Sequence, residues 1–110
     1  MRVSDFGLAT SHEIIREIGA RLRAQRLQQS LTQNELAARA AVSASALKTL
    51  ESTGKSTVET LVRVAGALGL LADFSQLFVP KAVSSIADLE RIERLERSQQ
   101  RLRAPRRRST

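Results

Sequence analysis

Basic side chains define most of the chemistry open to this chain. Its 110 residues contain 18 Lys and Arg against 11 Asp and Glu, which gives a net charge of +7. Eight of the arginines and only three Glu lie between residues 90 and 110, so this end carries +5 of that charge. Such an excess of guanidinium groups favours polyanionic partners, because binding them releases condensed counterions.

Catalysis and metal binding are disfavoured by the same composition. His12 is the single histidine and belongs to no recognisable set of catalytic or metal-ligating residues, so it is a poor general base or metal ligand. The absence of cysteine excludes disulfides, thiolate metal sites and cysteine nucleophiles. No Gly-rich phosphate loop or nucleophile–base pair is recognisable either. We therefore expect no enzymatic activity, no cofactor and no metal.

Two helix starts, eleven residues apart, organise the middle of the chain. Thr32 followed by Glu35 predicts a capping box, and Ser43 is typical of a second N-cap. The apolar residues that follow have helical spacing, at Leu36, Ala37, Ala40 and Val42, and again at Ala46, Leu47 and Leu50. Two short helices joined by a tight corner form a helix-turn-helix motif, here over residues 32–51, whose second helix can enter the major groove of DNA.

The motif and its surroundings, roughly residues 14 to 71, resemble the Xre/Cro/lambda-repressor family of DNA-binding domains. The matching residues are Thr32-Gln33, Glu35-Leu36-Ala37, Val42-Ser43, Leu47 and Leu50-Glu51. The resemblance implies an all-α fold with a five-helix lambda-repressor-like domain, followed here by a C-terminal helix and a basic tail. It also implies double-stranded DNA as a partner, bound at a two-fold operator by a homodimer.

The resemblance further assigns residues to DNA contacts. The residues expected to read bases are Ala44, Ser45, Lys48 and Thr49. Those expected to bind phosphate are Gln33, Arg26, Ser43 and Lys55. Arg26 and Glu51 pair as a salt bridge in several relatives, so we expect a structural role for Glu51 and a dual role for Arg26. The reading face offers no Asn, Gln or Arg for bidentate contacts, so specificity should draw on dimerisation and DNA shape.

The remaining elements are predicted from caps and apolar spacing. Residues 1–10 form an N-terminal arm, in which Val3, Phe6 and Leu8 can pack on the body or on a second subunit. The DNA-binding domain follows over 11–80. Its first helix is expected from a cap at Ser11 to about Gln29. Ser56 or Thr57 caps a later helix that stops at Gly69, and a short fifth helix runs from about Asp73 to Phe78. Ser30 and Ala41 stand at tight corners where many relatives carry glycine.

Two further regions admit more than one interpretation. An apolar patch either closes the core or forms a two-fold dimer interface, and consists of Leu70, Leu71, Phe74, Leu77 and Phe78. Residues 81–110 comprise a sixth helix, capped by Ser84 or Ser85, and a partly disordered tail. The apolar spacing of that helix is mostly three, which does not sustain a heptad. The tail binds phosphate, binds a protein partner or is simply solvated, and its arginines are Arg101, Arg103, Arg106, Arg107 and Arg108.

These features predict a cytoplasmic, sequence-specific transcriptional regulator, acting as a dimeric autorepressor. No apolar run approaches the ~18 residues of a membrane span, and no signal peptide is recognisable, so we expect no membrane partner. The exit Leu68-Gly69-Leu70-Leu71, the apolar patch and the basic tail resemble HipB-type antitoxins, which implies a HipA-like kinase toxin as a second partner. The alternative is a protein-interaction scaffold, or an antitoxin with little specific DNA binding.

Overall fold

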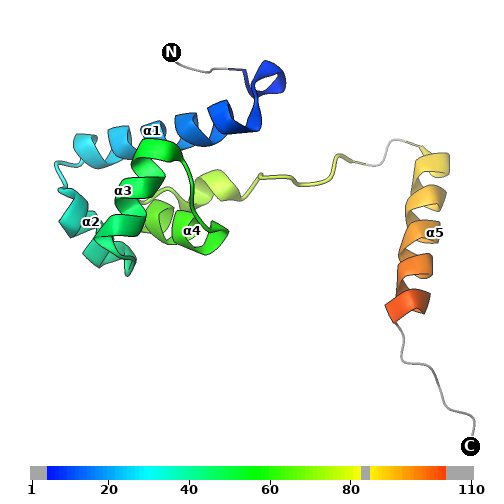
Figure 1. Cartoon of the computed structure of the whole chain (residues 1–110). Coiled ribbons are helices and arrows are strands. Elements are labelled where there is room, and N and C mark those ends of the chain that lie inside the picture. The colour runs from blue at the N-terminus through cyan, green and yellow to red at the C-terminus, as the bar shows by residue number, and fades with distance from the viewer. Residues whose placement is uncertain (1–4, 83–84, 104–110) are drawn as a thin grey trace, which may run out of the picture. The chain divides into compact units, whose positions relative to one another are not determined.

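Helices make up all the regular structure in the described residues, 5–82 and 85–103, and no strand occurs among them (Figure 1). The computed structural model divides into two units, Met1–Leu77 and Phe78–Thr110, which are described separately. The first unit contains η1 (Phe6–Leu8), α1 (Ser11–Gln28), α2 (Gln33–Ala40), α3 (Ala44–Thr53), α4 (Val58–Ala67) and η2 (Leu71–Phe74), where η denotes a 3-10 helix. The second contains α5 (Ile86–Arg103). The prediction of an all-α fold is confirmed.

The cap of α1 differs from the prediction by one residue. Thr10, not Ser11, is the N-cap, because its hydroxyl accepts the N–H of Glu13 at 3.2 Å. The Glu13 carboxylate in turn accepts the backbone N–H of Thr10 at 3.2 Å. This reciprocal capping box needs a spacing of three residues, which Thr10 has with Glu13 and Ser11 does not. Ser11 is therefore the first helical residue.

The N-caps of α2, α3 and α4 are hydrogen bonds between residues three apart, and they lie at positions predicted from the sequence. Thr32 and Glu35 form the predicted capping box, with both hydrogen bonds at 3.0 Å. Ser43 accepts the N–H of Ala46 at 3.0 Å, so it caps α3 as predicted. Of the two alternatives for α4, Thr57 is the cap, and the Ser56 hydroxyl instead donates to the Thr57 carbonyl at 2.9 Å.

The core of the first unit is aliphatic. Leu36, Leu47, Leu50 and Val64 are its most deeply buried side chains. They bring together α2, α3 and α4, while α1 packs mainly on α3 and contributes Leu22. The described aromatic residues stay outside this cluster, which is the expected result for a chain with only three of them. Most of the apolar positions predicted for the motif therefore lie in this core and hold α2 and α3 against it.

Two glycines allow α1 and α3 to approach closely. Gly19, in the middle of α1, faces the last turns of α3, where a Cβ atom would overlap the Leu50 carbonyl oxygen and lie 3.2 Å from that of Glu51. Gly54 follows α3 with φ 81°, and a Cβ there would overlap the Ile15 carbonyl. The far end of α3 is thus held against the backbone of α1.

Three helices end in the same closed turn, in which an N–H beyond the helix bonds the carbonyl five residues earlier. The pairs are Leu31 to Arg26, Val42 to Ala37 and Leu70 to Ala65, at 3.2, 3.0 and 2.8 Å. The residue before each donor has a positive φ, namely 56° at Ser30, 56° at Ala41 and 79° at Gly69. Only glycine adopts this left-handed conformation without a steric cost.

Substituting glycine at the two non-glycine corners should stabilise the fold. Ala41→Gly and Ser30→Gly are each expected to raise the free energy of unfolding by about 1 kcal/mol, because they remove the left-handed penalty. Urea denaturation measures the change. Ala38→Gly is the matched control, since Ala38 is an exposed residue inside α2 and its replacement should cost about 1 kcal/mol. A loss of stability at both corners would contradict this explanation.

The segment after α4 does not form the fifth helix predicted from Asp73 to Phe78. It forms η2, Leu71–Phe74, followed by turns whose bonds, such as Leu77 N–H to the Phe74 carbonyl at 3.0 Å, have the three-residue spacing of a 3-10 helix. No side chain caps this element, and Phe78 has φ 57°, so an α-helix neither starts nor continues here.

The predicted apolar patch is only partly covered in the first unit. Leu70 packs against the core, which supports its assignment to the core, and Phe74 is half-buried. Leu71 and Leu77 stay half-exposed, at 54% and 50%. Phe78, at 91% exposed, belongs to the second unit. The dimer interface suggested for this patch remains a prediction.

The second unit is described from α5 and its cap. Ser85 is the cap, since its hydroxyl accepts the N–H of Asp88 at 3.1 Å, and the alternative cap, Ser84, lies outside the described residues. Arg101 is exposed near the end of α5. The described part of the chain leaves out Val3, the Arg103 side chain, Arg106, Arg107 and Arg108, so it does not test the roles predicted for them.

Candidate nucleic-acid interface

The α3 helix has one exposed face and one anchored face. The four residues predicted to read bases, all exposed, are Ala44, Ser45, Lys48 and Thr49. Leu47, Leu50 and Glu51 are buried on the other side. The hydroxyls of Ser52 and Thr53 donate back to the carbonyls of Lys48 and Thr49, at 2.8 and 2.7 Å. The structure thus leaves the predicted reading face open to a ligand.

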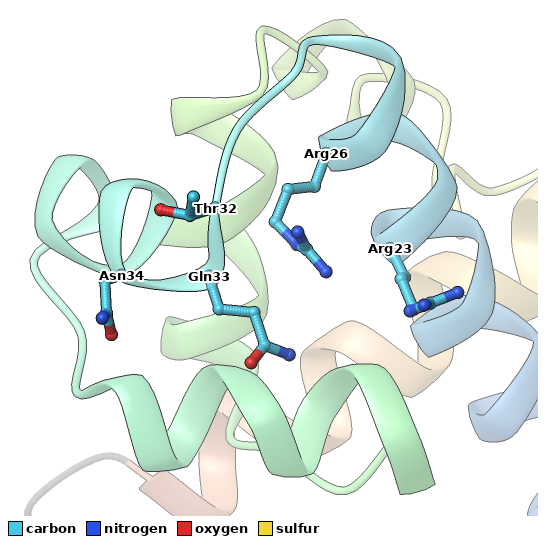
Figure 2. A pocket seen from close by; sticks show the side chains of 5 residues that line it. All are labelled: Arg23, Arg26, Thr32, Gln33 and Asn34. Carbon is cyan, nitrogen blue, oxygen red and sulfur yellow. The ribbon is translucent and has the colours of Figure 1, made fainter.

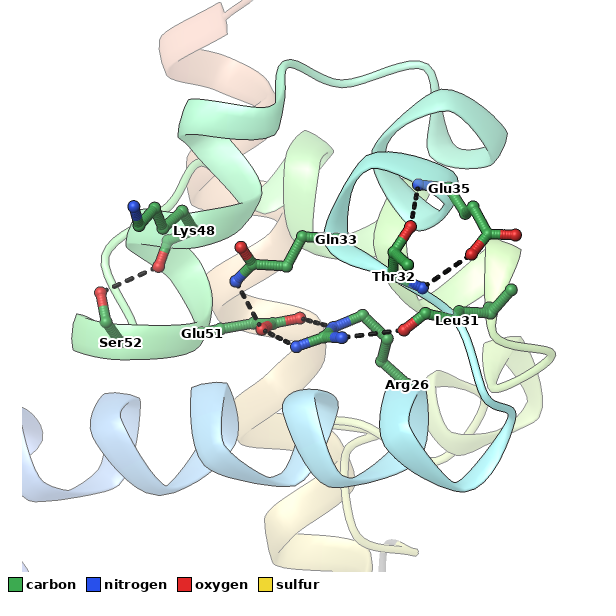
Figure 3. A network of polar contacts seen from close by, with 8 residues as sticks. All are labelled: Arg26, Leu31, Thr32, Gln33, Glu35, Lys48, Glu51 and Ser52. Atoms are coloured by element: carbon green, nitrogen blue, oxygen red, sulfur yellow. Dashed lines mark hydrogen bonds and ion pairs between the residues drawn. The ribbon is translucent and has the colours of Figure 1, made fainter.

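A buried ion pair lies beneath α3. The Arg26 guanidinium donates from Nε to Glu51 Oε2 at 2.7 Å and from Nη2 to Oε1 at 2.9 Å (Figure 3). Arg26 Nη1 donates to the Leu31 carbonyl at 2.8 Å. The two side chains are only 8% and 2% exposed. This bidentate pair ties the end of α1 to the last turns of α3.

The surroundings of Arg26 and Gln33 change how their predicted phosphate contacts are understood. Arg26 directs its nitrogens at Glu51 and Leu31, so the geometry supports its structural role and gives the phosphate role no support. Gln33 Nε2 donates to Glu51 Oε1 at 3.1 Å, so its amide belongs to the same network (Figure 3). What remains for an anion at Gln33 is the start of α2, where backbone N–H groups lack intrahelical partners.

An open pocket of about 530 Å³ lies at this start of α2 (Figure 2). Its lining residues are Arg23 and Arg26 from α1, with Thr32, Gln33 and Asn34. Sequence reasoning did not select Arg23 or Asn34. The available signals were the three-residue spacing of Arg23 from Arg26, which places both on one side of α1, and the position of Asn34 in the first turn of α2. An exposed arginine beside a helix N-terminus suits a phosphate group.

The other two predicted phosphate ligands stand at opposite ends of α3. Ser43 is exposed at its start, where its oxygen accepts the N–H of Ala46 and its O–H remains available as a donor. Lys55 is exposed just beyond the end, and its backbone N–H donates to the Thr53 hydroxyl at 3.1 Å. The length of α3 separates them by about 15 Å, so they would contact different phosphates.

Comparison with protein-family models adds an independent observation. A model described as a helix-turn-helix domain matches residues 17–74, which is more than half of the chain and extends from α1 to η2. The chain belongs to the helix-turn-helix domain family. A search of curated proteins found no match. The family match supports DNA binding and leaves the finer resemblance, to Xre/Cro-type repressors or HipB-type antitoxins, as a proposal.

Outside the helix-turn-helix surface, the described residues offer little other chemistry. His12 is exposed at the second position of α1. Among the described residues, no group of three or more His, Cys, Asp or Glu could hold a metal ion. None of the helices in the described ranges has the length and apolar character needed to cross a membrane.

The ion pair of the helix-turn-helix domain should make its stability depend on pH. Burial by itself raises the pKa of Glu51, but hydrogen bonds from Arg26 and Gln33 and the Arg26 charge outweigh it, so the pKa falls below its usual 4.5. A depressed carboxyl pKa stabilises the fold fully above the unfolded value, and this contribution is lost as pH falls through the folded one.

We therefore expect unfolding free energy to decline as the pH is lowered below 4.5, the usual pKa of the Glu51 carboxyl. Urea denaturation between pH 7 and pH 3 measures this. Glu13 and Glu35 contribute in the same direction, because the backbone N–H groups of Thr10 and Thr32 lower their pKa values. The Glu51→Gln variant should show a shallower decline than the parent. An identical decline in both proteins would rule out a Glu51 contribution.

Proposed function

We propose that this protein is a sequence-specific DNA-binding transcriptional regulator that acts as a dimeric autorepressor at a two-fold operator. The observation that carries the proposal is the open face of α3, on which every predicted base-reading residue is exposed. Ser45 and Thr49 can hydrogen-bond to several bases, Lys48 can reach guanine or phosphate, and the Ala44 methyl can contact thymine. The proposal involves binding and includes no catalytic step.

Positive groups flank that face. Arg23 lines the pocket at the start of α2. Lys55 lies beyond the end of α3. Phosphate contacts fix the position of a protein on the duplex without reading sequence. The small number of hydrogen-bonding side chains on α3 favours a dimer, because two half-sites double the number of bases read.

Titration of the DNA upstream of the gene and of a scrambled duplex, each at low and near-physiological salt, tests the proposal. We expect a preference for the upstream DNA that persists at the higher salt, because base contacts depend less on counterion release than phosphate contacts do. Equal binding to both duplexes that collapses with salt would contradict specific recognition. The symmetry of the protected site would then show whether two half-sites are used.

Two variants should separate base reading from phosphate binding. Lys48→Ala is expected to weaken binding to the upstream DNA about tenfold and to reduce the preference over the scrambled duplex. Arg23→Ala is expected to weaken binding to both duplexes equally and to lower the salt slope by about 1. Arg39→Ala is the control, because Arg39 is an exposed residue of α2 that does not line the pocket. It should change neither the preference for the upstream DNA nor the salt slope.

A narrower proposal is that the chain is the antitoxin of a HipA-like toxin–antitoxin module. It is supported by the resemblance of the α4 exit to HipB-type antitoxins and by the exposure of Leu71 and Leu77 next to it. Co-expression with a HipA-like kinase should give a stable complex and relieve the growth arrest that the kinase causes. A kinase that neither binds the chain nor loses its effect would exclude this role.

The alternative is a protein-interaction scaffold with little specific DNA binding. One observation favours it, namely that Arg26 and the Gln33 amide donate hydrogen bonds to Glu51, which leaves fewer of their donors for DNA. Isolation of a stable protein partner from a chain that shows no duplex affinity in the titration would select this alternative.

A further inference from the structure

The α5 helix carries apolar side chains, and the described residues of the second unit contain no other helix to cover them. Ile86, Leu89, Ile92, Leu95 and Leu102 are between 39% and 83% exposed. Most helical stability in proteins comes from packing an apolar face, and the exposure of these side chains leaves α5 without that contribution. A second helix that covers this face would supply the missing packing.

The second half of α5 has the spacing of a helix that pairs with a copy of itself. Although the apolar stripe as a whole drifts, four residues from Ile92 onward alternate steps of three and four, namely Ile92, Leu95, Gln99 and Leu102. They correspond to a, d, a and d of a heptad repeat. Ile at a with Leu at d favours a parallel coiled coil of two helices. A polar residue at one a position, here Gln99, fixes the register because its amide can bond that of its copy.

The charges on α5 fit the same parallel register. Arg91 falls at g and Glu96 at the following e, the two positions that face each other across a parallel pair. Glu96 makes no ion pair within the described residues, and Arg91 pairs only with Asp88, at 2.9 Å in an exposed position. Two-fold symmetry would give two Arg91–Glu96 bridges. The neighbouring Arg94, Arg97 and Arg101 fall at c, f and c, away from the seam, where their like charges do not oppose pairing.

We propose that α5 pairs in parallel and in register with α5 of a second copy of this chain, over Ile92–Leu102. Charge complementarity along the helix identifies the occupant of its apolar face as another copy rather than an unrelated protein. The inference rests on the dimer included in the proposed function, and it names the surface that forms the dimer. Pairing over two heptads is short, so the dimer should dissociate at low concentration.

Disulfide trapping in the full chain tests the register, since the natural sequence contains no cysteine. Gln99→Cys places a thiol in the seam, and Gln100→Cys places one on the outer surface one residue away. Under mild oxidation we expect covalent dimer to form at least about tenfold faster with Gln99→Cys, because only that thiol faces its copy. Equal rates, or faster trapping with Gln100→Cys, would overturn the proposal.

A charge swap tests the bridges by sedimentation equilibrium of the full chain. Glu96→Arg should weaken dimerisation about fivefold by placing like charges across the seam, and adding Arg91→Glu should restore it. No change with Glu96→Arg would overturn the role of α5. Titrating the upstream DNA with the charge-swap and cysteine variants separates the two proposals. A dimer that binds this DNA specifically but is trapped equally fast by Gln99→Cys and Gln100→Cys refutes only the pairing of α5. Dimers trapped through Gln99→Cys that show no preference for the upstream DNA refute the proposed regulatory function.

Discussion

Replacing Glu51 by Gln should remove about 3–5 kcal/mol from the free energy of unfolding, measured by urea denaturation at pH 7. The substitution keeps the shape of the side chain and removes its charge, so the Arg26 guanidinium remains buried without a counterion. The Arg26 side chain is only 8% exposed, so little water can replace the lost carboxylate. The loss should be large because removing one partner of a buried pair leaves the full desolvation cost of the other.

The exposed pair in α4 provides the matched control. Arg63 Nη2 and Glu59 Oε1 are 2.7 Å apart, as close as Arg26 and Glu51, but the side chains are 48% and 73% exposed. Glu59→Gln should therefore change stability by no more than about 0.5 kcal/mol. Replacing both buried partners, as Arg26→Met with Glu51→Leu, should recover most of the loss. Similar small costs at Glu51 and Glu59 would show that burial does not control the strength of these pairs.

Gly19→Ala should destabilise the first unit by about 3 kcal/mol or more, even though alanine is the better helix former. The new methyl group would overlap the Leu50 carbonyl oxygen, which is backbone and cannot rotate away as a side chain can. Relief would require α1 and α3 to move apart, which also pulls Arg26 away from Glu51. Thermal unfolding followed by circular dichroism measures the effect.

Gly66→Ala is the control for that substitution and should have the opposite sign. A Cβ at Gly66 would lie 3.5 Å from the Leu71 side chain, an ordinary contact, so only the gain in helix propensity remains. We expect it to stabilise the protein by about 0.5 kcal/mol. A stabilised Gly19→Ala variant would contradict the close approach of α1 to α3.

The features predicted correctly from the sequence are those set by neighbours in the chain. The caps at Thr32 and Ser43 depend on residues three positions away, so their bonds can be read from spacing alone. The same reasoning applied to Ser11 failed because Thr10 has the better spacing to Glu13. The fifth helix, predicted from about Asp73 to Phe78, had no identified capping residue, and the structure has only η2 there.

The features that the sequence did not reveal depend on tertiary packing. The resemblance assigns Gln33 to a phosphate contact, and the structure adds that its amide donates to Glu51, eighteen residues later in the chain. Arg23 joins the pocket at the start of α2 only because the end of α1 folds beside it. The three-residue spacing of Arg23 from Arg26 is a local signal, but it does not show that α2 begins beside them. Sequence patterns therefore located α3, and the fold was needed to find the groups around it.

The network of Gln33, Glu51, Arg26 and the Leu31 carbonyl also determines how the domain can move. Its bonds join the start of α2, the base of α3 and the end of α1 through one buried carboxylate. Tilting α3 relative to α2 would break charge-assisted hydrogen bonds to the buried Glu51 carboxylate, so the two helices should move as one rigid body. In a complex with DNA, the duplex would then have to adapt its groove to a protein template of fixed spacing. Stiff duplexes whose resting shape does not match that template would be rejected even where every contacted base is correct.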